Sequence, residues 1–366
     1  MSKVRFPSCF LLACALALPQ QPKPAEAEAQ EVHRSAILID THNDLPMRTA
    51  RGVDIGQRST QGHTDLPRLR EGGLGAVFFS AYVAPGYVGR NQSAHRALEM
   101  LDTIRNDIVG RYPDDFMLAL TADDIETAHR QGKIAALIGL EGGHAIEDSL
   151  RLLRTFCALG ARYMTLTHSN TNNWADSSGD INDPKIQHHN GLTDFGRQVI
   201  AEMNRLGMIV DVSHVSDKTF WDVLETSKAP IFASHSSCRA LCDDPRDMTD
   251  EMIRALAKRG GVIQINFNAG FLTKRKTPPA NLGDVVAHID YAVKLVGIDA
   301  VGIGSDFDGI EQPPVGLEDV SKFPSLTHAL LEKGYSPADI RKIYGGNTLR
   351  LMRAVEATAR RLTEIR

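Results

Sequence analysis

Between Ser35 and the C-terminus, eight short apolar runs alternate with longer amphipathic stretches, and this alternation limits the fold more than any other feature. The runs are rich in β-branched residues. Several are apolar throughout, not at every second position, which is typical of parallel strands covered on both faces. We predict strands at residues 36–40, 76–81, 134–140, 163–167, 208–211, 231–234, 261–266 and 301–304.

The intervening stretches predict helices. Ser216 and Thr249 stand where helices should begin, and Gly207 and Gly260 stand where they should end. The predicted helices cover residues 94–112, 122–131, 146–159, 194–206, 217–226, 249–259, 282–296, 321–333 and 337–362. Strands separated by helices in this way favour a closed (β/α)8 TIM barrel over an open sheet. A ninth strand at residues 116–120 remains open, and we expect residues 28–366 to form a single domain.

Residues 1–27 have the pattern of a secretory signal peptide. Lys3 and Arg5 precede a short apolar run at residues 10–18, and small residues follow. The run is shorter than the roughly 20 apolar residues that cross a bilayer. We therefore predict export to the periplasm or the extracellular space and no transmembrane span. Cleavage after either Ala17 or Ala27 fits the pattern.

Two other interpretations of the N-terminal segment stay open. Lipidation at Cys14 would attach the exported chain to the membrane, and the segment could instead be a disordered tail. The cysteines after it are Cys157, Cys238 and Cys242, and no C-x-x-C pattern occurs. The spacing supports neither a cysteine zinc site nor a disulfide framework, although a bridge between Cys238 and Cys242 remains open.

The net charge of the chain indicates which kinds of partner to expect. The formal net charge is −4, which gives no reason to expect nucleic acid or an anionic membrane surface. We therefore expect a small substrate.

Histidine and acidic residues gather at the ends of the predicted strands. His42 and Asp44 are two residues apart, so on an extended chain both side chains point the same way. Glu141 ends a strongly apolar strand, where a carboxylate is costly unless it is paired or metal-bound. The other strand-end candidates are His168, His214, His235, Asp306 and Asp308. Because strand ends meet at one face of such a barrel, a shared site is favoured over separate core histidines and helix caps.

The types of residue indicate the metal. Imidazole and carboxylate without thiolate suit Zn²⁺, with Mn²⁺, Fe²⁺ or Co²⁺ as substitutes. Three histidines and two acids exceed the three protein ligands that are usual for one catalytic zinc ion. Two ions about 3.5–4 Å apart, bridged by one carboxylate and a hydroxide, would use them all.

These residues lie in segments that resemble the renal (membrane) dipeptidase family, a branch of the amidohydrolase barrels. The segments are IDTHNDLP at 39–46, EGGH at 141–144, RYMTLTH at 162–168, VDVSH at 210–214, SHSS at 234–237 and SDFDG at 305–309. The resemblance implies two Zn²⁺ ions per chain. It assigns His42, Asp44 and Glu141 to one ion, and Glu141, His214 and His235 to the other, so that Glu141 and a water or hydroxide bridge them.

The resemblance also implies three roles outside the metal ligands. His168 would contact the substrate carbonyl and stabilise the oxyanion, Arg246 would bind the terminal carboxylate, and Asp306 would transfer the proton. The residues alone leave alternatives for each role. Arg246 could form a surface ion pair with one of the neighbouring acids Asp243, Asp244 and Asp247. His168 could orient other site residues without touching the substrate. Asp306 could bind metal instead, or Asp308 could transfer the proton in its place.

The implied activity is hydrolysis of small dipeptides, including those with a C-terminal D-residue, on a homodimer. A hydroxide held between the metal ions would attack the peptide carbonyl. One alternative is a related metal amidohydrolase that acts on N-acyl amino acids or lactams, and another is an inactive metal-binding protein. Asn170 stands at one half-cystine position of the mammalian enzymes, and we expect neither their disulfides nor their C-terminal lipid anchor.

Overall fold

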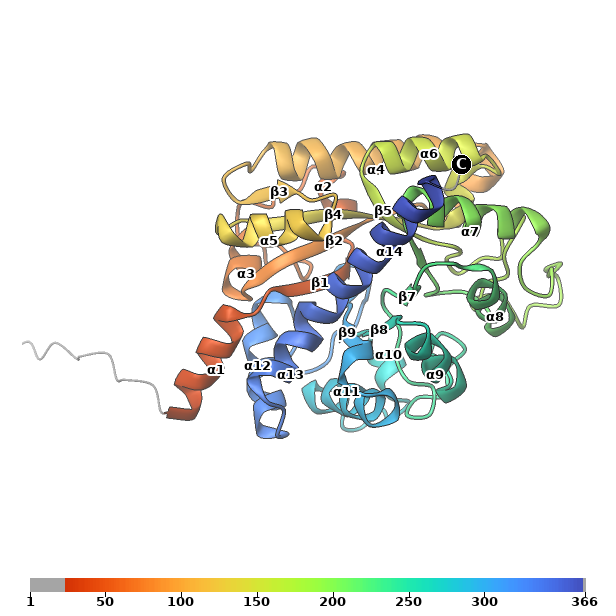
Figure 1. The fold of residues 1–366 in the computed structure, drawn as a ribbon. Coiled ribbons are helices and arrows are strands. Elements are labelled where there is room, and N and C mark those ends of the chain that lie inside the picture. Colours follow the sequence, from red (N-terminus) through yellow and green to blue (C-terminus); the bar gives the residue numbers. More distant parts are fainter. Residues whose placement is uncertain (1–23, 365–366) are drawn as a thin grey trace, which may run out of the picture.

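Eight parallel strands of the computed structural model follow one another around a nearly closed barrel (Figure 1). The structure describes residues 24–364. The order of the strands is β1-β2-β4-β5-β6-β7-β8-β9, and the predicted (β/α)8 barrel is confirmed. Their bounds are β1 Leu38–Asn43, β2 Leu74–Tyr82, β4 Ile134–Glu141, β5 Ala161–Thr165, β6 Ile209–Asp211, β7 Phe232–Ala233, β8 Val262–Ile265 and β9 Val301–Ile303.

The ambiguous segment at residues 116–120 forms a short ninth strand, β3 (Phe116–Leu118), outside the ring. It pairs with residues 134–136 at the start of β4, whereas β5 pairs with residues 138–141 further along the same strand. Strand β3 therefore pairs with β4 ahead of the residues with which β5 pairs. It is not part of the ring, and the barrel has the eight strands that we predicted.

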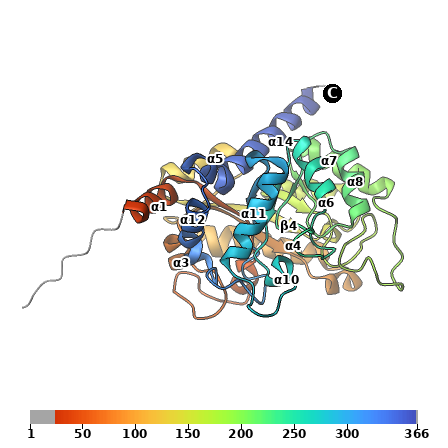
Figure 2. The same cartoon turned by 90° about the horizontal axis from the view of Figure 1, so that it is seen from below.

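Helices surround the strands, as the view from below shows (Figure 2). Their bounds are α1 Pro24–Ser35, α2 Leu45–Thr49, α3 Leu66–Glu71, α4 Ser93–Asp102, α5 Ala122–Arg130, α6 Leu150–Ala158, α7 Asp194–Leu206, α8 Asp217–Thr226, α9 Asp250–Lys258, α10 Ala269–Leu272, α11 Leu282–Val296, α12 Phe323–Glu332, α13 Pro337–Arg341 and α14 Asn347–Glu364.

Two predicted helices are interrupted by π-helical turns. Helix α4 continues as η2 (Thr103–Gly110), and α13 is joined to α14 by η6 (Lys342–Gly346). Ile104 and Tyr344 inside these turns are fully buried, so the apolar pattern runs on through them. A π-helical turn adds one residue per hydrogen-bonded ring, which an apolar periodicity does not reveal.

The N-terminal helix α1 lies beside α12 (Figure 1), where His33 Nδ1 is 2.7 Å from the Thr327 hydroxyl. Predicted cleavage after Ala27 falls within this helix. The apolar run at residues 10–18, Ala17 and Cys14 lie outside the described residues. No helix within residues 24–364 is both long and apolar enough to cross a bilayer.

Strands β9 and β1, the two ends of the sheet, meet at the mouth of the barrel. Within residues 24–364 an isolated bridge joins Asn43, the last residue of β1, to Phe307, four residues after the end of β9. The buried carboxylate of Asp40 adds two hydrogen bonds, accepting from the backbone N–H of Ser305 at 2.8 Å and from its hydroxyl at 2.6 Å. A side chain thus completes the closure that the backbone ladder leaves open.

Three aromatic rings fill the interior below this mouth. Phe78, Tyr163 and Phe232 come from β2, β5 and β7, which do not pair with one another. The Tyr163 ring centroid nevertheless lies 5.3 Å from each of the other two. Gly139 on β4 leaves room for this ring, because a Cβ atom there would lie 2.0 Å from Tyr163 Cζ.

Replacing Gly139 by Ala should therefore displace Tyr163 and lower the free energy of unfolding by about 1–3 kcal/mol, the usual cost of overpacking a core. Urea unfolding followed by circular dichroism measures this change. Gly86→Ala is the matched control, because a Cβ there has no neighbour within 4 Å. Equal stability of the two variants would contradict this account of the interior.

Candidate active site

The structure brings the predicted strand-end residues to one mouth of the barrel. His42 lies on β1, Glu141 ends β4, and His214 and His235 follow β6 and β7. Ligand atoms within 4.8 Å of one another form three groups among the described residues. These groups are His42, Asp44 and Glu141; Glu141, His214 and His235; and His42, His235 and Asp306.

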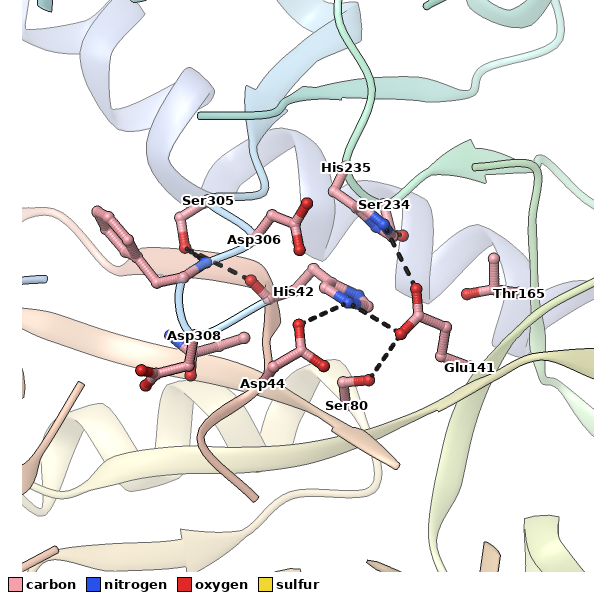
Figure 3. A network of polar contacts seen from close by, with 12 residues as sticks. His42, Asp44, Ser80, Glu141, Thr165, Ser234, His235, Ser305, Asp306 and Asp308 are labelled. Carbon is pink, nitrogen blue, oxygen red and sulfur yellow. Dashed lines mark hydrogen bonds and ion pairs between the residues drawn. The ribbon is translucent and has the colours of Figure 1, made fainter. Parts of the chain in front are cut away.

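Glu141 lies at the centre, and its two carboxylate oxygens face different partners. Oε2 is 3.4 Å from His42 Nε2, whereas Oε1 is 3.2 Å from His214 Nε2 and 3.5 Å from His235 Nε2. Figure 3 shows this carboxylate facing both His42 and His235. The Ser80 hydroxyl donates to Oε2 at 3.1 Å. The arrangement is that expected of a carboxylate shared between two cations.

The nitrogen atoms of the cluster fit metal ligation. His42 Nε2 is buried without a hydrogen-bond partner, although Asp44 Oδ2 lies 3.3 Å away. His214 Nε2 and His235 Nε2 approach to 2.9 Å beside the same carboxylate oxygen. Lone pairs directed at a common centre suit a divalent cation that accepts imidazole and carboxylate together.

Protonation favours ligation by two of the three histidines. Burial lowers the pKa of His214 and His235 well below the usual value, with the charge of Arg246 adding to the effect. Both rings are therefore neutral, the form in which imidazole binds metal. Burial opposes charge on His42 too, but Tyr163, Glu141 and Asp44 raise its pKa well above the usual value, so a metal ion would displace a proton there. Burial alone would raise the pKa of Glu141, but the neighbouring imidazoles, His42 first, hold it well below its usual value. The carboxylate is ionised.

Hydrogen bonds behind the ligands orient the rings. The Ser234 hydroxyl lies 2.7 Å from His235 Nδ1 and donates to the Asp211 carboxylate at 2.6 Å. Because that hydroxyl has a single hydrogen, Nδ1–H of His235 must donate to Ser234, which leaves Nε2 free to bind metal. Likewise, His42 Nδ1 is 2.7 Å from the Tyr163 hydroxyl.

Sequence reasoning did not identify these supporting residues. Asp211 lies in the matched segment VDVSH, and Ser234 in SHSS, yet both look like ordinary polar residues at strand ends. The sequence does show that Asp211 is an acid at the end of an apolar strand, which is the feature that singled out Glu141. In the structure Asp211 is fully buried.

A cavity of about 250 Å³ opens over the cluster. His168, Arg246 and Asp306 line it together with the apolar side chains of Met47 and Phe271. Arg246 is buried, and its guanidinium donates to the Ser236 hydroxyl and the His235 carbonyl, each at 3.0 Å. Its Nε atom has no partner. Arg246 therefore lies buried on the cavity and not on the surface, where the sequence had left an ion pair open as an alternative.

Asp306 and Asp308 differ in their surroundings. Asp306 lines the cavity, and Asn266 donates to its Oδ2 at 2.9 Å. Burial raises the pKa of Asp306 to about 7. Asp308 is instead held outside the cavity by the backbone N–H of His63 at 2.7 Å and by Arg48 at 3.3 Å.

The predicted cysteine alternatives are settled for the described residues. Cys157, Cys238 and Cys242 are free thiols. The sulfur of Cys238 lies 3.7 Å from the His288 carbonyl oxygen, and that of Cys242 lies 3.2 Å from the Gly270 carbonyl oxygen. The two thiols therefore contact different carbonyls and are not bridged.

Comparison with known proteins identifies the family of this chain. The family model described as membrane dipeptidase (peptidase family M19) matches residues 26–366. This chain belongs to the membrane dipeptidase family. It is thus placed among hydrolases, and the resemblance predicted from the motifs is confirmed. Dipeptidase 3 from Mus musculus is 38% identical over 340 residues, which cover 90% of this chain and 66% of that protein.

Solved structures with the same fold include members of this family. The probable dipeptidase PvdM from Pseudomonas aeruginosa has a TM-score of 0.82 at 26% identity, covering 93% of this chain and 100% of that one. A metallo peptidase from Rhodobacter sphaeroides, liganded with a phosphinate mimic of the dipeptide L-Ala-D-Ala, has a TM-score of 0.78 at 29% identity. That match covers 88% of this chain and 100% of the other.

If Glu141 bridges two ions, Glu141→Gln should reduce bound zinc from two ions per chain to one or none, because the amide nitrogen of Gln cannot coordinate metal. Elemental analysis after dialysis measures the stoichiometry. Asp308→Asn is the matched control, a carboxylate equally buried beside the site, and should retain both ions. Full zinc content in Glu141→Gln would disprove the bridge.

Proposed function

We propose that this chain is a zinc-dependent dipeptidase that cleaves small dipeptides, including those with a C-terminal D-residue. The observation that carries the proposal is the placement of a buried arginine, Arg246, and the metal-ligand cluster on one small cavity. A guanidinium on the same small cavity as the reacting centre would select a short substrate that ends in a free carboxylate. The Rhodobacter sphaeroides protein with its L-Ala-D-Ala mimic supports the choice of substrate.

Two zinc ions, held by His42, Asp44 and Glu141 and by Glu141, His214 and His235, would supply an activated bridging water at neutral pH. The residues of this chain perform the remaining tasks. Arg246, which lines the cavity, would bind the substrate carboxylate through its guanidinium. His168, on the cavity wall with Nε2 4.0 Å from Glu141 Oε1, would donate to the carbonyl oxygen as negative charge develops on it.

Asp306 would move the proton. Its Oδ2 is fixed by Asn266, so Oδ1 can take the proton from the attacking water and deliver it to the leaving amine. Direct metal binding by Asp306, beside His42 and His235, is the alternative that the third ligand group allows. Export, predicted from residues 1–27, and a homodimer, implied by the family, remain predictions.

The substrate class is tested with a panel of L,L and L,D dipeptides and N-acetyl amino acids, with metal content measured on the same sample. We expect turnover of both dipeptide series, slower hydrolysis of the N-acetyl compounds, loss of activity with a chelator and recovery with zinc. Preference for the N-acetyl compounds would favour the amidohydrolase alternative. Two bound zinc ions without turnover of any compound in the panel would favour the alternative of an inactive metal-binding protein.

The role of Arg246 is tested by comparing each dipeptide with its C-terminal amide. Wild-type protein should prefer the free acid, since a charge-assisted pair contributes about 1.5–3 kcal/mol, roughly 10–150-fold in kcat/KM. Arg246→Met should remove most of this preference and affect the amides much less. If the variant still preferred free acids by the same factor, another group would bind the carboxylate.

A further inference from the structure

The turn that follows β9 carries both acids of the segment SDFDG, and only Asp306 lines the substrate cavity. The backbone N–H of Gly309 donates to the Asp306 carbonyl at 3.1 Å and closes a four-residue turn. Asp306 and Asp308 have φ values of 65° and 66°, in the left-handed region that is uncommon for residues with side chains. Such a backbone persists only where the surrounding structure holds it.

Asp308 is the residue through which a distant segment holds this turn. Its backbone N–H donates to His63 Nδ1 at 2.9 Å, and its Oδ1 accepts from the His63 backbone N–H at 2.7 Å. Arg48 donates to the same oxygen at 3.3 Å. His63 therefore binds both the backbone and the side chain of Asp308, whose carboxylate points away from Glu141 (Figure 3).

The ring of His63 has the form that this contact requires. Because a backbone N–H can only donate, Nδ1 must carry a lone pair, and the ring hydrogen is on Nε2. Burial lowers the pKa of His63, which favours this neutral ring at pH 7. The ring also packs beside Phe307 of the same turn, with the two centroids 5.5 Å apart. Both a hydrogen bond and packing therefore join His63 to the turn.

The segment around His63 is anchored by contacts that do not involve the turn. The His63 carbonyl accepts from the backbone N–H of Val320 at 3.1 Å. At the next residue, the Thr64 hydroxyl accepts from the Asn43 amide at 3.0 Å, and the Thr64 carbonyl accepts from Arg48 at 3.1 Å. Since Asn43 is the last residue of β1, this segment connects the end of β1 to the turn after β9.

A shift of the turn would move Asp306 relative to the metal-ligand cluster. Gly309 lies so close to two acids that a Cβ atom there would be 2.3 Å from Asp44 Oδ2 and 2.6 Å from Asp306 Oδ1. Asn266 donates to the other oxygen of Asp306, which leaves Oδ1 for the proposed proton transfer. The place of this oxygen beside Asp44 therefore depends on where the turn is held.

We propose that His63 is a positioning residue for dipeptide hydrolysis, which through Asp308 holds the turn that aims Asp306 at the substrate. This inference rests on the proton-transfer role proposed above for Asp306. His63 does not line the substrate cavity, and within residues 24–364 no hydrogen bond joins its side chain to a candidate metal ligand. The inference also gives Asp308 a function other than the proton transfer that the sequence left open for it.

Two substitutions of similar shape separate the hydrogen bond from packing. His63→Leu removes the acceptor, whereas His63→Asn keeps an oxygen close to the position of Nδ1. Because a misplaced catalytic group costs up to about 100-fold in rate, we expect kcat for a dipeptide to fall about tenfold or more in His63→Leu and to stay within about threefold of wild type in His63→Asn. His95→Leu, at an exposed histidine on α4, is the control and should leave kcat unchanged.

Further measurements distinguish positioning from a general structural effect. The zinc content of His63→Leu should equal that of wild type, and so should its preference for free acids over C-terminal amides, which depends on Arg246. Hydrogen exchange followed by mass spectrometry should be faster at residues 305–310 in His63→Leu than in His63→Asn or wild type. Thermal unfolding shows which variants are folded, and His63→Ala replaces His63→Leu if that variant does not fold.

Wild-type kcat or wild-type exchange in His63→Leu would overturn the proposal. An equal loss of kcat in His63→Asn would overturn it too, because the effect would then come from packing against Phe307, and so would loss of zinc from His63→Leu. If the wild-type chain hydrolysed no dipeptide, the proposed function would fail. The exchange at residues 305–310 would still decide whether His63 holds the turn.

Discussion

The burial of one carboxylate at the end of an apolar strand is the constraint on which the rest of this structure depends. Glu141 is ionised and 3% exposed, and a buried charge without compensation is costly. Three imidazoles and a serine hydroxyl surround it. His214 and His235 are neutral, so without a metal ion the positive charge beside Glu141 comes from His42, whose pKa is raised, against the effect of burial, well above its usual value by Tyr163, Glu141 and Asp44. Bound cations would complete the balance, so the fold and metal binding meet at this residue.

Two buried carboxylates behind the metal-ligand cluster are also compensated by hydrogen bonds. Asp211 and Asp40, both fully buried, each accept from the backbone N–H and the hydroxyl of one serine on the next strand. Asp211 orients the ring of His235 through Ser234, and Asp40 draws β9 against β1. Hydrogen bonds that join strands therefore also aim ligands, which is why so short a strand as β7 can present a histidine accurately.

Strand-end chemistry could be predicted from the sequence because parallel strands of a barrel deliver their last residues to one face. His42, Glu141 and His235 follow from that rule and from spacing alone. The π-helical turns could not be predicted, since the buried face continues through them. Nor does the local sequence show that Arg246 would line the substrate cavity, because that depends on the contacts of its loop with Ser236 and the His235 carbonyl. Long-range placement of loops is where local patterns carry least information.

The closure of the barrel has a consequence for how the chain is made. At the base of the seam between β1 and β9, the π-helical turn η6 contacts both strands, and Gly345 approaches the Ile37 carbonyl so closely that a Cβ atom would lie 2.2 Å from it. During translation every candidate metal ligand emerges before this turn does. The full ligand set is therefore synthesised before the turn that packs against the base of the seam.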